Sequence, residues 1–77
     1  MSPALRSNLT AASAAYLMLG RMMAELEQAG RHGNINRIGN AAADAQAQAD
    51  ALAVQLSAAF AQAGVDSAKA YDRGVAA

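Results

Sequence analysis

The side chains that could do chemistry are few, and several that can donate hydrogen bonds fall in one short segment. Between residues 30 and 40 the chain places Arg31, His32, Asn34, Asn36 and Arg37, with glycines among them. A loop that carries such donors could bind an acidic protein surface or the phosphates of a nucleic acid. The Gly and Asn residues equally suit an ordinary turn, so both interpretations stay open.

The residues needed for catalysis are largely missing. There is one histidine, His32, and no cysteine, and the serines have no base placed beside them. Glu25 and Glu27 are two positions apart, so they point to different sides of a helix and do not form an acid–base pair. A lone histidine is a weak metal site, because zinc sites use three or four protein ligands. We therefore expect a protein that is not an enzyme and that needs no cofactor and no metal.

The elements that must position these residues are predicted to be helices. The chain has 77 residues, and 55% of them are apolar, but 23 of the apolar residues are alanines. Alanine is the best helix former, and the chain has only one proline. The absence of cysteine excludes a disulfide framework. The sequence therefore predicts an all-α fold in a single helical domain over residues 1–77.

A first helix is expected at about residues 3–29. Ser2 can cap it, Pro3 suits its first position, and Gly30 can end it. Apolar residues recur at alternating steps of three and four, which is the pattern of a helix that packs along one seam. The expected seam consists of Leu5, Leu9, Ala12, Tyr16, Leu19, Met23 and Leu26.

A second helix is expected at about residues 35–63, after a tip loop at about 30–34. Its seam follows the same steps through Ile35, Ile38, Ala42, Ala45, Ala49, Leu52, Leu56, Ala59 and Ala63. Two caps are possible: Asn34 gives a short loop, whereas Asn40 gives a longer one, and the continuous pattern favours Asn34. Gly64 is expected to end this helix, and a short helix is expected at about 67–73. A short loop between long helices predicts an antiparallel hairpin.

The first helix also carries a second apolar line, formed by Ala11, Ala15, Met18 and Met22, with Leu17 nearby. A hairpin has only one helix–helix interface, so this line would remain exposed in a monomer. Pairing two hairpins about a two-fold axis would cover it. We therefore expect a homodimer that forms a four-helix bundle, with Met23 in the core of each hairpin.

Charge gives little support for other partners. The net charge is zero, with a balance of +2 over residues 1–40 and of −2 over residues 41–77. Neither half is basic enough to indicate a nucleic-acid-binding domain. The longest apolar run, residues 14–19, is too short to span a membrane, and no signal-peptide cleavage site follows it. We expect a cytoplasmic protein, and five arginines against one lysine favour a GC-rich bacterial or phage genome.

In outline, a short helical hairpin resembles small helical secretion chaperones, phage accessory proteins and the export partners that carry a Trp-x-Gly turn. It departs from the last group because it has no tryptophan and its turn reads Arg31-His32-Gly33. The sequence favours a small protein-binding module that acts as an inhibitor, adaptor or assembly factor on an unidentified protein. The expected contact residues are Leu17, Met18, Met22, Arg31, His32, Asn34, Asn36 and Arg37. The alternative is a dimeric nucleic-acid-binding regulator that uses the basic tips.

Overall fold

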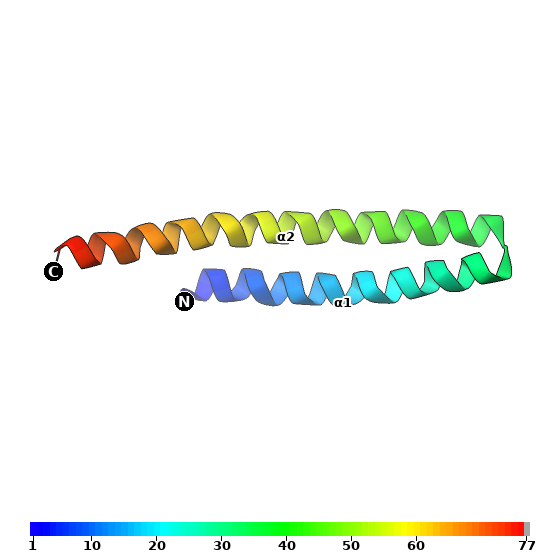
Figure 1. Cartoon of the computed structure of the whole chain (residues 1–77), viewed down its shortest axis with the longest axis horizontal. Helices are drawn as coiled ribbons and strands as arrows, with labels where there is room; N and C mark the ends of the chain where they lie inside the picture. Colours follow the sequence, from blue (N-terminus) through cyan, green and yellow to red (C-terminus); the bar gives the residue numbers. More distant parts are fainter. Residues whose placement is uncertain (77) are drawn as a thin grey trace.

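Two long helices lie side by side and antiparallel in the computed structural model, which describes the backbone of residues 1–76 and the side chains of residues 1–74 (Figure 1). Helix α1 spans Pro3–His32 and helix α2 spans Ile35–Ala76. The expected all-α helical hairpin is confirmed. Its Cα atoms fill a rod of 64 × 13 × 13 Å.

Helix α1 begins where the sequence predicts. The Ser2 hydroxyl accepts a hydrogen bond from the Leu5 N–H at 3.1 Å, and Pro3 takes the first helical position. The predicted end at residue 29 is wrong, because the helix continues to His32. Gly30 keeps helical geometry, and Gly33 ends the helix with φ +66°, where a residue with a Cβ atom is strained.

The turn between the helices is Gly33-Asn34, shorter than the loop expected at 30–34. The Asn34 side-chain oxygen accepts from the Arg37 N–H at 3.1 Å, and its backbone carbonyl accepts from the Ile38 N–H at 2.9 Å. These two bonds satisfy N–H groups of the first turn of α2. The prediction that Asn34, and not Asn40, caps this helix is confirmed.

The predicted third helix at 67–73 is wrong, because α2 runs without interruption to Ala76. Gly64 lies inside α2, and Gly33 is the only glycine of the described residues with a positive φ. A glycine inside a helix costs about 1 kcal/mol relative to alanine. This cost at one position does not require the helix to end there. Asp66 does not cap a helix either; its carboxylate binds Ser2 instead.

The seam between the helices is built mainly on small side chains. The buried residues of the described chain are all alanines, namely Ala12, Ala15, Ala29, Ala41, Ala45 and Ala59. Half-buried residues complete the seam at steps of three and four: Leu5, Asn8, Leu19, Met22 and Leu26 in α1, and Ile38, Gln48, Leu52, Gln55 and Gln62 in α2. Small residues let two helix axes approach closely. The contact therefore depends on close approach and not on bulk.

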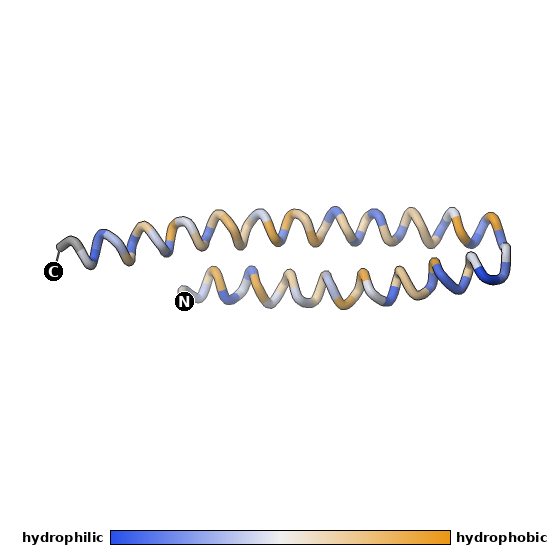
Figure 2. The backbone as a smooth tube through the Cα atoms, in the orientation of Figure 1, coloured by the Kyte–Doolittle hydropathy of each residue, from blue (hydrophilic) through white to orange (hydrophobic). Residues whose placement is uncertain are grey.

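Three of the seven residues of the first expected seam and four of the nine of the second are therefore wrong. Leu9, Tyr16 and Met23 of α1, and Ile35, Ala42, Leu56 and Ala63 of α2, are exposed. A heptad pattern marks two neighbouring lines on a helix, and the helices are rotated so that the smaller and more polar line is buried. In Figure 2, hydrophobic residues occur along the whole length of both helices, whereas the turn is hydrophilic.

Candidate interaction surface

A shallow apolar groove runs along one side of the hairpin, where the two helices meet. It is lined by Leu9, Ala12, Ser13, Tyr16 and Leu17 of α1 and by Leu52 and Leu56 of α2. No residue of this lining is charged. The groove brings together leucine and tyrosine side chains that are about forty residues apart in the sequence.

Four contacts between the helices fix which residues lie at the same level. Asn8 Nδ2 donates to the Ala58 carbonyl and Gln48 Nε2 donates to the Ala15 carbonyl, each at 3.4 Å. Ser2 contacts Asp66 at one end, and Glu25 pairs with Arg37 at the other. Residues at matching levels thus have numbers that add to about 65. Tyr16 lies level with Ala49.

A step of seven residues returns to the same side of a packed helix, so residues beyond the groove share its face. We call this surface the uncharged stripe. It comprises Leu9, Tyr16 and Met23 of α1 with Ala42, Ala49, Leu56 and Ala63 of α2, and it is bordered by Ser13, Gly20, Gly39, Gln46, Ala53 and Phe60. None of these residues is charged. Arg6 and Glu27 stand at its border on α1, one near each end.

The large side chains of the uncharged stripe are strongly exposed. Tyr16 is 66% exposed, Leu56 is 53% exposed and Phe60 is 85% exposed. Large exposed apolar patches on soluble proteins mark places where another molecule packs. The stripe is therefore the part of the described chain best suited to bind a protein.

The donors of the tip are largely engaged within the chain. The Arg31 guanidinium pairs with the Glu27 carboxylate, and Arg37 donates to Glu25 through Nε at 2.8 Å and through a terminal nitrogen at 2.6 Å. Asn34 caps α2. These pairs reduce the positive charge that the turn offers to phosphates. His32, at the end of α1, and Asn36, in the first turn of α2, remain exposed.

The expected second apolar line does not form one exposed surface. Ala15 is buried and Met22 is half-buried between the helices, whereas Met18 is exposed. Leu17 lines the apolar groove. Met23, expected in the core, is exposed, whereas Met22, expected on the outer line, is half-buried between the helices. The reason is the rotation of α1 that brings the line of Asn8, Ala15 and Met22 towards α2.

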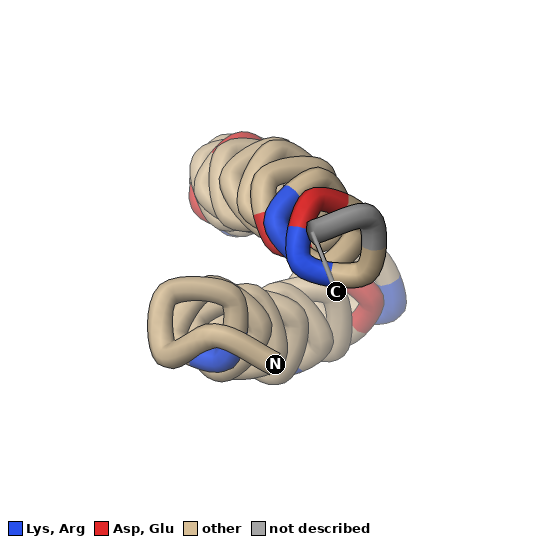
Figure 3. The backbone as a smooth tube through the Cα atoms, turned by 90° about the vertical axis from the view of Figure 1, so that its left-hand side faces the viewer, with Lys and Arg blue, Asp and Glu red and all other residues tan. Residues whose placement is uncertain are grey.

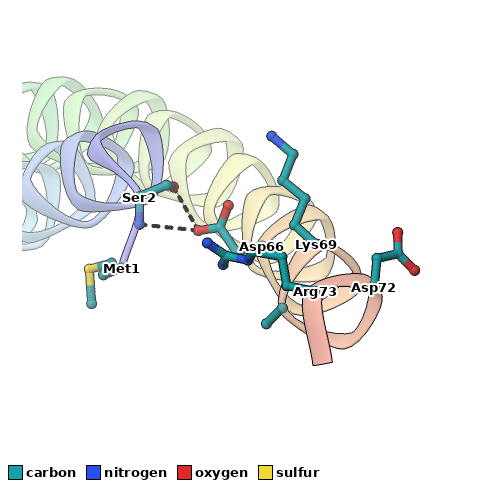
Figure 4. A pocket seen from close by; sticks show the side chains of 7 residues that line it. Met1, Ser2, Asp66, Lys69, Asp72 and Arg73 are labelled. Atoms are coloured by element: carbon teal, nitrogen blue, oxygen red, sulfur yellow. Dashed lines mark hydrogen bonds between the residues drawn. The ribbon is translucent and has the colours of Figure 1, made fainter. Parts of the chain in front are cut away.

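At the open end of the hairpin, Asp66 holds the start of α1 against α2 (Figure 4). Its carboxylate accepts from the Ser2 hydroxyl at 2.6 Å and from the Ser2 N–H at 3.4 Å, and Gln62 donates to its other oxygen at 3.0 Å. The hydrogen bond from the Ser2 hydroxyl, followed by that from Gln62, lowers the pKa of Asp66 below its ordinary value of 3.8. Sequence analysis missed this contact, because Ser2 and Asp66 are 64 residues apart.

This carboxylate makes the open end sensitive to acid. A carboxyl group whose pKa is lowered by folding stabilises the fold above its unfolded pKa, and the effect is lost as pH falls through its folded pKa. We expect the Ser2 and Leu5 amide signals in an NMR titration to shift together with the Asp66 carboxyl below pH 3.8. In Asp66→Asn these signals should show no such step. A titration of Asp66 at or above its ordinary pKa would contradict the contact.

Residues 1–74 bring together no group of three or more His, Asp or Glu side chains able to hold a metal ion. Neither α1 nor α2 has an apolar stretch sufficient to cross a bilayer, as far as Ala76. Viewed from the open end, acidic and basic residues alternate around the last turns of α2 (Figure 3). No family model, curated protein sequence or solved structure matches this chain significantly.

Proposed function

We propose that this chain is a small, non-enzymatic protein-binding module that works as a homodimer. In this proposal two hairpins pack through the uncharged stripe and form a four-helix bundle. The dimer then binds another protein as an inhibitor, adaptor or assembly factor. The single observation that carries the proposal is an uncharged, exposed apolar surface that runs along the hairpin.

The accessible area supports self-association. The chain exposes 5555 Å², whereas a compact monomer of 7.8 kDa exposes about 4,400 Å². The excess is about 1,200 Å², and a standard protein interface buries about 800 Å² on each partner. A second hairpin is therefore large enough and apolar enough to remove this excess.

The rest of the surface is left for the second partner. Leu17 and Met18 are exposed, and methionine side chains adapt to partners of different shape. His32 and Asn36 at the tip offer hydrogen bonds to a polar surface. The nucleic-acid alternative has less support, because Arg31 and Arg37 are each paired with a glutamate.

Thermal unfolding at several protein concentrations tests this proposal. Association stabilises the folded state by mass action, so the melting temperature of a dimer rises with concentration. We expect the melting temperature, measured by circular dichroism, to rise by at least about 5 °C between protein concentrations of about 5 and about 500 µM. A melting temperature that stays constant over this range would refute the homodimer.

A further inference from the structure

We infer that the partner on the uncharged stripe is a second copy of this chain in an antiparallel orientation, with the two turns at opposite ends of the bundle. The two-fold axis crosses the helices at the level of Tyr16 and Ala49. This inference rests on the proposed function, and it adds the orientation and register of the dimer.

The two ways of stacking the hairpins differ in which residues meet. If the two-fold axis runs along the helices, the turns share one end and α1 lies over α2 of the partner subunit. If the axis runs across the helices, the turns lie at opposite ends and each helix lies over its own copy. Only in the second arrangement does a residue of one helix meet a different residue of the same helix in the other copy. The two residues lie at equal distances from the two-fold axis, on opposite sides of it.

The charges at the border of the stripe fit the second arrangement. Arg6 lies ten residues before Tyr16, and Glu27 lies eleven residues after it. A crosswise axis at Tyr16 therefore places Arg6 of each copy beside Glu27 of the other copy. Arg6 makes no ion pair within the described part of its own chain, so its guanidinium is available. Glu27 pairs with Arg31 through one carboxylate oxygen, and its other oxygen is the one that would accept from Arg6 of the other copy. A lengthwise axis would instead leave Glu27 beside Gly39, without an opposite charge.

Side-chain size along α2 fits the same arrangement. Leu56 lies seven residues after Ala49 and Ala42 lies seven before it, so each leucine meets an alanine of the other copy. Phe60 is strongly exposed in one hairpin. It lies eleven residues after Ala49, and Gly39 lies ten before it, so Phe60 of one copy lies beside Gly39 of the other. Large side chains thus meet small ones along α2, as close packing requires. Along α1, Leu9 meets Met23 and the two Tyr16 rings meet at the axis, where aromatic rings can stack with an offset.

Cysteine cross-linking tests the orientation, because the natural chain has no cysteine. The two variants are Ala49→Cys and Ala42→Cys, which replace small residues one heptad apart on the same stripe. In the antiparallel dimer, the two thiols introduced at position 49 face each other near the axis. The two thiols introduced at position 42 are about 21 Å apart along the bundle, at 1.5 Å per residue, beyond the reach of a disulfide. With the axis lengthwise, the two variants behave alike.

Each variant is oxidised at a concentration where light scattering gives a dimer, and circular dichroism checks that it remains helical. We expect nearly complete covalent dimer for Ala49→Cys and little for Ala42→Cys. Equal cross-linking of the two variants, or none in either while the dimer persists, would overturn the orientation alone. A monomer by light scattering would instead refute the proposed function itself.

A charge exchange supplies a second readout. Arg6→Glu places like charges at both ends of the stripe, and we expect it to weaken the dimer about tenfold at low salt. The double variant Arg6→Glu/Glu27→Arg restores opposite charges across the interface but also removes the Glu27–Arg31 pair within α1, so it should regain part of this loss. A double variant that is no tighter than the single one would contradict the pairing of these residues.

Discussion

Replacing Leu56 by lysine is expected to raise the dissociation constant of the dimer by at least about 100-fold. Leu56 lies on the uncharged stripe and lines the apolar groove with Leu52 and Leu9. Each buried leucine contributes about 1.5–3 kcal/mol, and the substitution occurs twice in a symmetric dimer. The lysine ammonium also resists burial without a counter-charge. Sedimentation velocity over a concentration series measures the change.

Val54→Lys is the matched control for this variant. Val54 is 65% exposed on the same helix, two residues from Leu56, but outside the uncharged stripe. The control adds the same charge and removes an apolar side chain of similar size. We expect its dissociation constant to stay within about threefold of the natural value, since surface substitutions usually have small effects. Equal weakening by both variants would show that charge, and not the stripe, controls association.

Enlarging Ala45 is expected to cost about 1–3 kcal/mol of unfolding free energy. Ala45 is 6% exposed and lies in the seam where α2 faces α1. In Ala45→Leu the larger side chain must push the helices apart, because a seam of alanines has no space for it. The separation also weakens the contacts of Ala41 and Gln48, one turn away on each side. Chemical unfolding at a fixed protein concentration measures the loss.

Ala43→Leu provides the comparison, because Ala43 is exposed on the outer side of the same helix. Leucine is nearly as good a helix former as alanine, so we expect a change below about 0.5 kcal/mol. If Ala45→Leu were as stable as the natural chain or more stable, the seam would have to contain unfilled space, and the close approach of the helices would be wrong.

The course of the chain could be predicted from local signals. Ser2 and Pro3 mark the start of α1, and Asn34 marks the start of α2 through its side-chain oxygen. Alternating steps of three and four predicted both helices, and the short loop between them predicted their antiparallel pairing. These signals depend only on neighbouring residues, which is why they needed no knowledge of the folded chain.

The rotation of the helices could not be predicted in the same way. The sequence favours the bulky line through Leu9, Tyr16 and Met23 as the seam, whereas the structure buries the line through Ala15 and Met22. Both lines satisfy the heptad pattern, and the choice depends on how closely two backbones approach. The uncharged stripe follows from that choice.

One further error has a local cause. Gly64 is a common type of residue at a helix end, but here it keeps helical geometry and α2 continues past it. The contact of Arg31 and Arg37 with a partner stays a prediction, and each of these arginines pairs with a glutamate, one within α1 and one across the turn. The pairing across the turn depends on the register of the two helices, which the sequence pattern did not specify.

Sedimentation equilibrium of the unmodified chain tests the central claim most directly, namely that the exposed apolar surface of one hairpin is covered by another. We predict a mass of twice the 7.8 kDa of one chain at micromolar concentration, with full helicity by circular dichroism. A fully helical chain that sediments at 7.8 kDa at the highest concentration measured would contradict the account.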